Sequence, residues 1–145
     1  MSLSGVNWLG VIIALIVTFI SGAIWFGPKT FYPRWIAAMQ HKGWTRSDHQ
    51  DDKSEMGFIF GSLVVAQIIQ ILILALFITT LQSHNSGIGI LDGAIIGALA
   101  GIGFCAAPNT GHRLFAGNGI KVMFIENGND ILNLALAGAI IAGMN

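Results

Sequence analysis

Four long apolar stretches dominate this chain of 145 residues. Their bounds are 6–26, 56–81, 88–110 and 122–144. A helix crosses the roughly 30 Å of bilayer hydrocarbon with about 20 mainly apolar residues, because it rises about 1.5 Å per residue. The first three stretches contain one charged residue, Asp92, whereas the last contains Glu126 and Asp130. We therefore predict an all-α integral membrane bundle of four transmembrane helices, of which the last is the weakest span.

The overall composition agrees with a membrane environment. Hydrophobic residues make up 54% of the chain and charged residues only 10%, which is too little ionic surface to cover a soluble globule. Seven basic and seven acidic residues balance to zero net charge, so the sequence does not point to a nucleic-acid partner. At this length we expect one domain, residues 1–145, with the lipid bilayer as its surroundings.

The basic residues indicate how the helices are oriented. All seven fall in the segment between the first two spans or in the one between the last two: Lys29, Arg34, Lys42, Arg46, Lys53, Arg113 and Lys121. Loops rich in Lys and Arg stay on the cytoplasmic side, so both termini are predicted to be non-cytoplasmic. Because no basic residue follows the last of these, the pattern leaves open a fourth segment that re-enters the membrane without crossing it.

The first basic loop also contains aromatic residues, which prefer the headgroup layer of a membrane. Pro33 can occupy the first turn of a helix, and Trp35, Ile36 and Met39 would then project to one side. We predict a short interfacial helix here, between the first and second spans.

An acidic cluster precedes the second span, with Asp48, Asp51, Asp52 and Glu55 around His49. These residue types could bind a metal ion. A solvated acidic first turn that favours the helix dipole explains them without further ligands, and we prefer that interpretation. No metal and no cofactor is predicted.

Glycines repeat every four residues along the third stretch, at Gly93, Gly97 and Gly101. This spacing places them on one helix face, which allows close approach of another backbone in lipid. The partner could be a second subunit or the surface formed by Ala135, Ala139 and Gly143 in the fourth stretch. We expect a homo-oligomer or a subunit of a membrane complex.

The fourth stretch carries the candidate solute-binding or ion-binding residues, Glu126, Asn129, Asp130 and Asn133. Successive steps of about 100° place these four within about 100° of arc, so they form a polar stripe if the segment is helical. Counted from Lys121 at the membrane edge, Asp130 would lie about 13 Å deep, near the bilayer centre. An ionised carboxylate there costs several kcal/mol unless it is paired or hydrated, and no intramembrane Lys or Arg stands out as its partner.

A second interpretation of the same segment remains open. Asn127 followed by Gly128 is typical of a turn, and Asn129 or Asp130 would then cap a shorter helix. Both carboxylates would in that case lie in a wet interfacial loop. The remaining helix of about 15 residues would be short for a full span.

Other polar residues in the apolar stretches have structural explanations. Gln67 and Gln70 are one turn apart and can form hydrogen bonds to neighbouring helices. Pro108 removes a helical donor, and we expect Asn109 and Thr110 to repair the backbone locally.

Several segments resemble the domain of unknown function 1761 family, a group of small bacterial membrane proteins. The resemblance rests on the order and spacing of Asn7–Trp8, Gly22–Pro28, Trp35–Met39, Leu114–Gly117 and Phe124–Gly128. The family pattern has Asn and then Ala where this chain has Glu126 and Asn127. The resemblance implies a four-helix, multi-pass protein of the bacterial inner membrane, without an established activity.

The stripe suggests an oligomeric transport or channel-like protein for a small solute, a proton or a cation. The alternative is a structural or accessory subunit of a larger membrane complex, which would need only the glycine face and the interfacial aromatics. We do not predict an enzyme and name no catalytic residue, because Glu126 and Asp130 are the only acid–base candidates and no nucleophile accompanies them.

Overall fold

The computed structural model describes residues 5–43 and 53–145, and every long element in these ranges is a helix. The elements are α1 (Trp8–Trp25), α2 (Tyr32–His41), α3 (Lys53–His84), α4 (Ile90–Ala100), the π-helix η3 (Gly101–Ala106), α5 (Ala107–Phe115) and α6 (Ile120–Met144). Helices α4, η3 and α5 follow one another without a break. The predicted all-α fold is confirmed. The acidic residues Asp48, Asp51 and Asp52, and His49 among them, lie outside the described residues.

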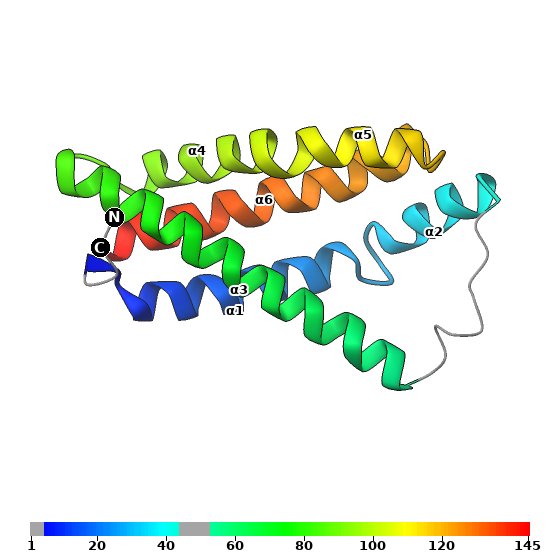
Figure 1. Cartoon of the computed structure of the whole chain (residues 1–145), viewed down its shortest axis with the longest axis horizontal. Coiled ribbons are helices and arrows are strands. Elements are labelled where there is room, and N and C mark those ends of the chain that lie inside the picture. Colours follow the sequence, from blue (N-terminus) through cyan, green and yellow to red (C-terminus); the bar gives the residue numbers. More distant parts are fainter. Residues whose placement is uncertain (1–4, 44–52) are drawn as a thin grey trace.

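Helix α6 is the central element of the bundle (Figure 1), and α1, α2, α3, α4, η3 and α5 all pack against it. Both ends of the described chain lie at the same end of the bundle (Figure 1). There the Asn7 side chain donates a hydrogen bond to the carbonyl of Met144 at 2.6 Å. The Asn145 amide donates to Gln82 at 3.0 Å, which joins the end of α6 to α3.

The prediction of four apolar spans requires a correction. Among the described helices, three are long and apolar enough to cross a membrane: α1, Glu55–His84 within α3, and Ile90–Phe115, which runs from α4 through α5. Helix α6 is not one of them, because the polar residues from Glu126 to Asn133 lower its hydropathy. Nevertheless α6 is one continuous helix of 25 residues, about 37 Å long, so of the two interpretations left open at Asn127 and Gly128 the structure has the helix and not the turn.

The core forms where α1 and the second half of α3 meet α6. Ile71 and Ile78 of α3 are fully buried, as are Ala14 of α1 and Ala137 of α6. Gln67 donates a hydrogen bond to Thr18 at 3.3 Å, and Gln70 donates to the Cys105 sulfur at 3.0 Å. The prediction that both glutamines bond to neighbouring helices is therefore confirmed.

The glycine face of α4 and η3 packs within the chain, against α6. A methyl group at Gly97 would overlap the Leu134 carbonyl oxygen, and one at Gly93 would overlap the carbonyl of Gly138. Gly101 lies against the backbone of Ile131 in the same way. Such backbone contact excludes any larger side chain, so these glycines fix the distance between the two helices.

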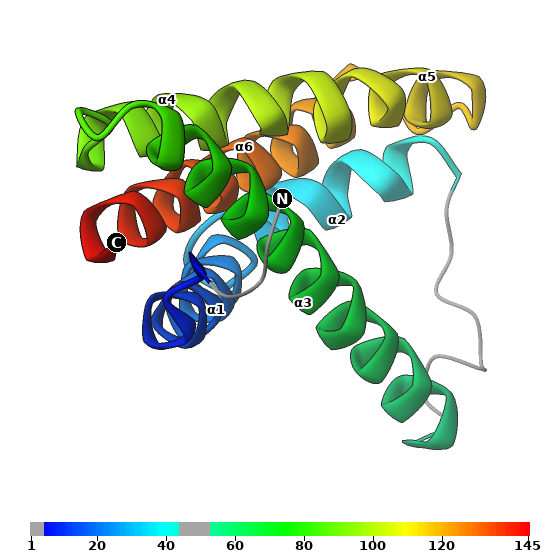
Figure 2. The same cartoon turned by 60° about the vertical axis from the view of Figure 1, so that its left-hand side comes forward.

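The first half of α3 diverges from the other helices (Figure 2). Its residues 57–66 are all exposed, and Phe58 is 76% exposed. Gly57 and Gly61, four residues apart, have open space where a side chain would be. The second half of α3 carries all of this helix's buried residues.

The turn of π-helix lies just before Pro108. A proline inside a helix has no N–H to donate and its ring crowds the carbonyl four residues earlier, so the turn before it widens. The Thr110 hydroxyl donates to the Ala106 carbonyl at 2.7 Å, whereas the carbonyl that Pro108 leaves without its helical donor is that of Phe104, so the predicted repair by Thr110 stays a prediction. Asn109 instead bonds to α6.

The predicted short helix is confirmed as α2, with Pro33 in its first turn. Met39 is buried, and Trp35 and Ile36 are partly buried, whereas Tyr32 and Arg34 are exposed. The apolar side of α2 therefore faces the protein.

Candidate functional site

The predicted polar stripe of α6 is present, but its residues belong to two different clusters. The first, which we call the Glu126 cluster, lies near the start of α6 and comprises Glu126 and Asn127 with their partners from α2 and α5. The second, which we call the Asn133 cluster, lies one to two turns later and comprises Asn129, Asp130 and Asn133.

In the Glu126 cluster, the carboxylate is paired with a cation, and both of its oxygens have partners. Its side chain is only 13% exposed and forms an ion pair with Arg113, with 2.5 Å between Nε and Oε2. The Trp35 indole N–H donates to the other carboxylate oxygen at 2.9 Å, and the Asn109 amide approaches Oε2 at 3.5 Å. No intramembrane Lys or Arg stood out in the sequence as a partner for either carboxylate of the stripe, but α5 brings Arg113 to Glu126.

Asn127 extends the same network into the protein. It accepts a hydrogen bond from the Asn109 amide at 2.7 Å. Its own amide donates to the Thr110 hydroxyl at 3.1 Å and to the Ala106 carbonyl at 3.3 Å. All of its polar atoms therefore have partners, so this buried residue ties α6 to the end of η3 and the start of α5.

In the Asn133 cluster, one buried oxygen has no partner. Asn133 is only 7% exposed, and its amide donates to the Asn129 side-chain oxygen at 3.3 Å. Its own side-chain oxygen is the one buried side-chain polar atom of the described residues without a hydrogen bond. A buried acceptor without a donor costs about 1–3 kcal/mol, so this oxygen is unusual in a packed interior.

Gly22 of α1 covers these two asparagines. A methyl group at Gly22 would lie 3.7 Å from the Asn133 amide nitrogen and 3.9 Å from the Asn129 side-chain oxygen. Asp130 lies within electrostatic reach of Glu126 and Cys105. The cluster therefore offers two amide oxygens and a carboxylate within two turns of one helix.

Such a group of oxygens can accept hydrogen bonds from a donor-bearing solute or hold a cation or a proton. In the described ranges, no group of three or more His, Cys, Asp or Glu residues is placed to hold a metal ion. Helix α5 carries the cation that neutralises Glu126, and α2 carries the indole that donates a hydrogen bond to it, whereas α1 covers Asn133.

Sequence reasoning identified the four stripe residues but missed their partners. Arg113 and Trp35 lie 13 and 91 residues before Glu126, so spacing along one helix cannot connect them. A second indole, Trp25, donates to the Ile125 carbonyl at 3.0 Å, and its ring lies against Gly128. A buried carboxylate needs a counter-charge. Arg113, the arginine nearest to the stripe in the sequence, was therefore the signal from which its pairing with Glu126 could have been predicted.

These features define a class of helical protein in which three apolar helices pack against a fourth helix that carries polar clusters. The chain belongs to the family described as protein of unknown function (DUF1761), whose model matches residues 9–142. This match confirms the resemblance noted in the sequence. No curated protein and no solved structure matches the chain.

Proposed function

We propose that this chain is a four-span membrane protein that passes a small solute, a proton or a cation along α6. The fourth span is α6 itself, which packs against all three apolar helices. A helix in the middle of a bundle does not need the hydropathy of a lipid-facing helix, because its polar groups are satisfied by neighbouring helices. Helix α6 is about 37 Å long, which is enough to cross the hydrocarbon of the bilayer.

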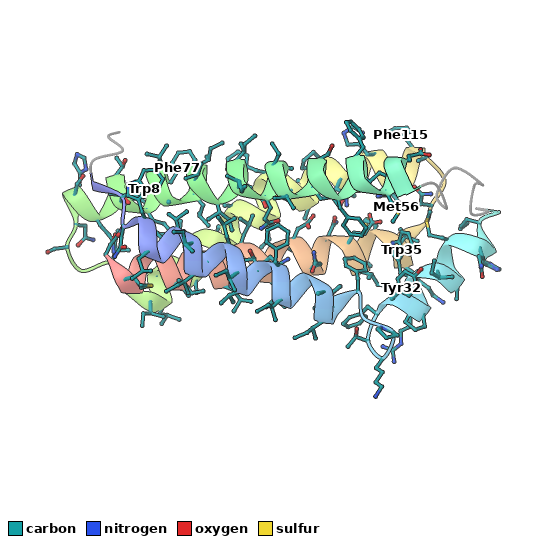
Figure 3. The ribbon with its side chains drawn as sticks, turned by 90° about the horizontal axis from the view of Figure 1, so that it is seen from below. Trp8, Tyr32, Trp35, Met56, Phe77 and Phe115 are labelled. Carbon is teal, nitrogen blue, oxygen red and sulfur yellow. The ribbon has the colours of Figure 1, made fainter. Side chains whose placement is uncertain are left out.

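The distribution of surface residues supports this placement. Trp8 lies near one end of the bundle, and Tyr32, Trp35 and Phe115 lie near the other (Figure 3). Aromatic residues gather at both membrane interfaces, and basic residues gather on the cytoplasmic side. With the end that carries α2 on the cytoplasmic side of a bacterial inner membrane, both termini are non-cytoplasmic and α2 lies in the headgroup layer.

The observation that carries the transport proposal is the unpartnered oxygen of Asn133. It lies beside Asn129 and one turn from Asp130, in the middle third of α6. A passing cation or hydrogen-bond donor would satisfy this oxygen. The Glu126 cluster, in contrast, has no free group to offer and serves to hold α2 and α5 on α6.

The oligomeric part of the proposal rests on α3. Residues 57–66 of its diverging half are all exposed, and Gly57 and Gly61 leave a shallow face there. Two glycines four residues apart allow close contact between helices in lipid, so we propose that this face meets a second copy. The glycine face of α4 is not available for that purpose, because α6 occupies it.

The test is ion flux into liposomes that contain the purified protein, with proton, sodium and potassium gradients imposed in turn. We expect flux above that of protein-free liposomes, and at least a tenfold loss in Asp130→Asn and in Asn133→Leu. The matched control is Asp92→Asn, which makes the same chemical change at the exposed start of α4. Wild-type rates no higher than those of protein-free liposomes for every ion would contradict passage of a proton or cation.

The accessory-subunit alternative has its own measurement. Purification of the full chain from native membranes in mild detergent would recover foreign subunits in fixed stoichiometry if the diverging half of α3 packs against another protein. The transport proposal instead expects only copies of this chain.

A further inference from the structure

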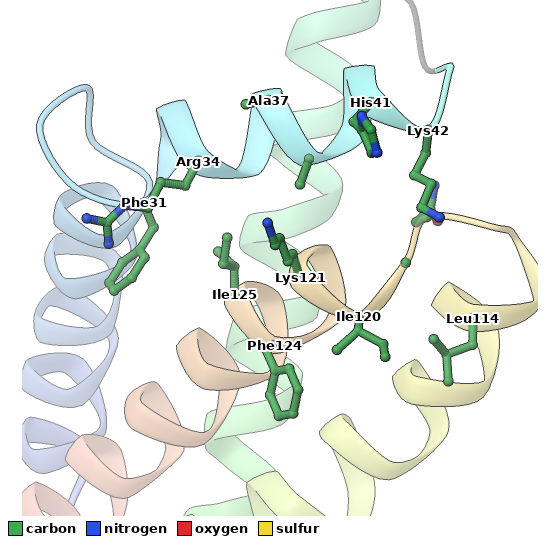
Figure 4. A pocket seen from close by; sticks show the side chains of 13 residues that line it. Phe31, Arg34, Ala37, His41, Lys42, Leu114, Ile120, Lys121, Phe124 and Ile125 are labelled. Atoms are coloured by element: carbon green, nitrogen blue, oxygen red, sulfur yellow. The ribbon is translucent and has the colours of Figure 1, made fainter.

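A groove lies between α2 and the junction of α5 with α6 (Figure 4). The groove is open and has a volume of about 980 Å³, and its lining includes no residue of the Glu126 cluster or the Asn133 cluster. Its walls combine basic and apolar residues. The residues that carry the argument are Arg34, His41, Lys42, Leu114, Lys121 and Phe124.

The charged lining of the groove has one sign. Arg34, Lys42 and Lys121 line it, together with His41, and none of the described residues that line it is acidic. This is a concentration of positive charge in a chain whose net charge is zero. In the described part of the chain these three cations form no ion pair with a carboxylate, since the nearby Glu126 pairs with Arg113. Within residues 5–43 and 53–145, the groove therefore has no counter-charge of its own.

The apolar lining lies on the other side of the groove. The Lys121 side chain extends towards α2, whereas Phe124 points in the opposite direction, along α6 (Figure 4). Phe124 is 67% exposed, and Ile120 and Leu114 beside the groove are also exposed. A ligand that fills the groove would meet positive charge at one end and an open apolar surface at the other.

The geometry points to the headgroup of an anionic glycerophospholipid as the occupant of this groove. Its phosphate would lie between Lys42 and Lys121, and its acyl chains would run over Phe124 and Leu114. The Arg34 guanidinium lies over the Phe31 ring at the other end of α2 and adds positive charge at longer range. Basic pockets between helices on the cytoplasmic side are known to take anionic headgroups, and the attraction of each nearby Lys or Arg strengthens binding severalfold. A soluble phosphate compound would leave the apolar side unused. This lipid site is separate from the proposed solute site on α6.

The site can be tested on the purified full chain in detergent, by native mass spectrometry with added phosphatidylglycerol. Phosphatidylcholine with the same acyl chains is the uncharged comparison, and glycerol phosphate is the headgroup without chains. We expect phosphatidylglycerol to bind more than about tenfold more tightly than either. We also expect Lys121→Gln and Lys42→Gln each to weaken its binding about fivefold.

The matched control is Lys29→Gln, which removes the same charge from an exposed residue outside the groove. It should leave phosphatidylglycerol binding unchanged. Circular dichroism of each variant confirms that the helices are retained, and Lys42, which follows α2, gives a second variant if Lys121→Gln fails to fold. Equal binding of the two lipids, equal weakening by Lys29→Gln, or displacement by glycerol phosphate at similar concentrations would each overturn the proposal.

Discussion

The two polar clusters of α6 lie within two turns of each other and differ in one respect. In the Glu126 cluster, every polar group has a partner, including a cation for the carboxylate. In the Asn133 cluster, a buried oxygen has none. Both clusters look alike in the sequence, as Asn and acidic residues inside an apolar stretch.

The difference separates two kinds of polar residue inside a membrane helix: those that stabilise the bundle and those that are free to bind a ligand. A satisfied group holds helices together, and its loss costs stability. An unsatisfied group costs stability by being present, so its retention calls for another explanation, such as a ligand. Substitutions in the Glu126 cluster should therefore lower the free energy of unfolding, whereas loss of the Asn133 oxygen should leave it almost unchanged, and this can be measured in detergent by thermal unfolding.

The largest expected effect comes from Arg113→Met. This change leaves the Glu126 carboxylate without its cation and should lower the free energy of unfolding by about 2–3 kcal/mol, at the lower end for a buried pair because Arg113 is partly exposed. The double variant Arg113→Met, Glu126→Gln removes both charges and should recover most of that loss. A thermal midpoint unchanged in the single variant would show that the ion pair does not hold α5 to α6.

Asn127→Leu should cost about 2 kcal/mol. The leucine cannot accept from Asn109 or donate to Thr110, so two partly buried polar side chains lose a partner. Gln40→Leu is the control, because it replaces an exposed amide at the end of α2 with the same apolar side chain. Equal midpoints for the two variants would contradict a structural role for Asn127.

Trp35→Phe should cost about 1–2 kcal/mol, since it removes one hydrogen bond to a carboxylate while leaving an aromatic ring in place. Tyr32→Phe, a change of similar size on the exposed side of α2, should have no measurable effect. Equal thermal midpoints for the wild type and both variants would show that the indole does not anchor α2 to α6.

Asn133→Leu should have the smallest effect on stability, within about 0.5 kcal/mol of the wild type, because the lost bond to Asn129 is offset by removal of an unpartnered oxygen. It should nevertheless abolish the proposed flux. Destabilisation as large as that of Asn127→Leu would place Asn133 among the structural residues and remove the distinction between the clusters.

The helices themselves were predictable from the sequence because apolar stretches of this length have few alternatives. The predicted bounds 6–26 and 88–110 correspond closely to α1 and to the helix Ile90–Phe115, and Pro33 predicted the short helix α2. The close packing of Gly93, Gly97 and Gly101 also followed from their spacing. Their partner, α6, could not be predicted from that spacing, because any helix with small residues could pack against these glycines.

The partners of the polar residues could not be predicted, because they depend on how separate helices meet. The 100° step of a helix predicted that Glu126 and Asn133 share one face. It could not show that α5 and α2 cover Glu126, or that α1 covers Asn133. The continuous helix at Gly128 was also undecided, because glycine and asparagine favour turns in water. The Trp25 ring packs on Gly128, and the Asn127 side chain bonds to η3 and α5, so contacts with neighbouring helices stabilise the helical form of this segment.

Solvent access to α6 tests the distinction between the two kinds of polar residue most directly. In a chain with Cys105 replaced by alanine, single cysteines are placed by Asn133→Cys and by Ala137→Cys, one turn later in the dry core. Intact membranes are then treated with a small, charged thiol reagent. The solute pathway predicts labelling at position 133 and protection at position 137. Protection at both positions would contradict a pathway through the Asn133 cluster.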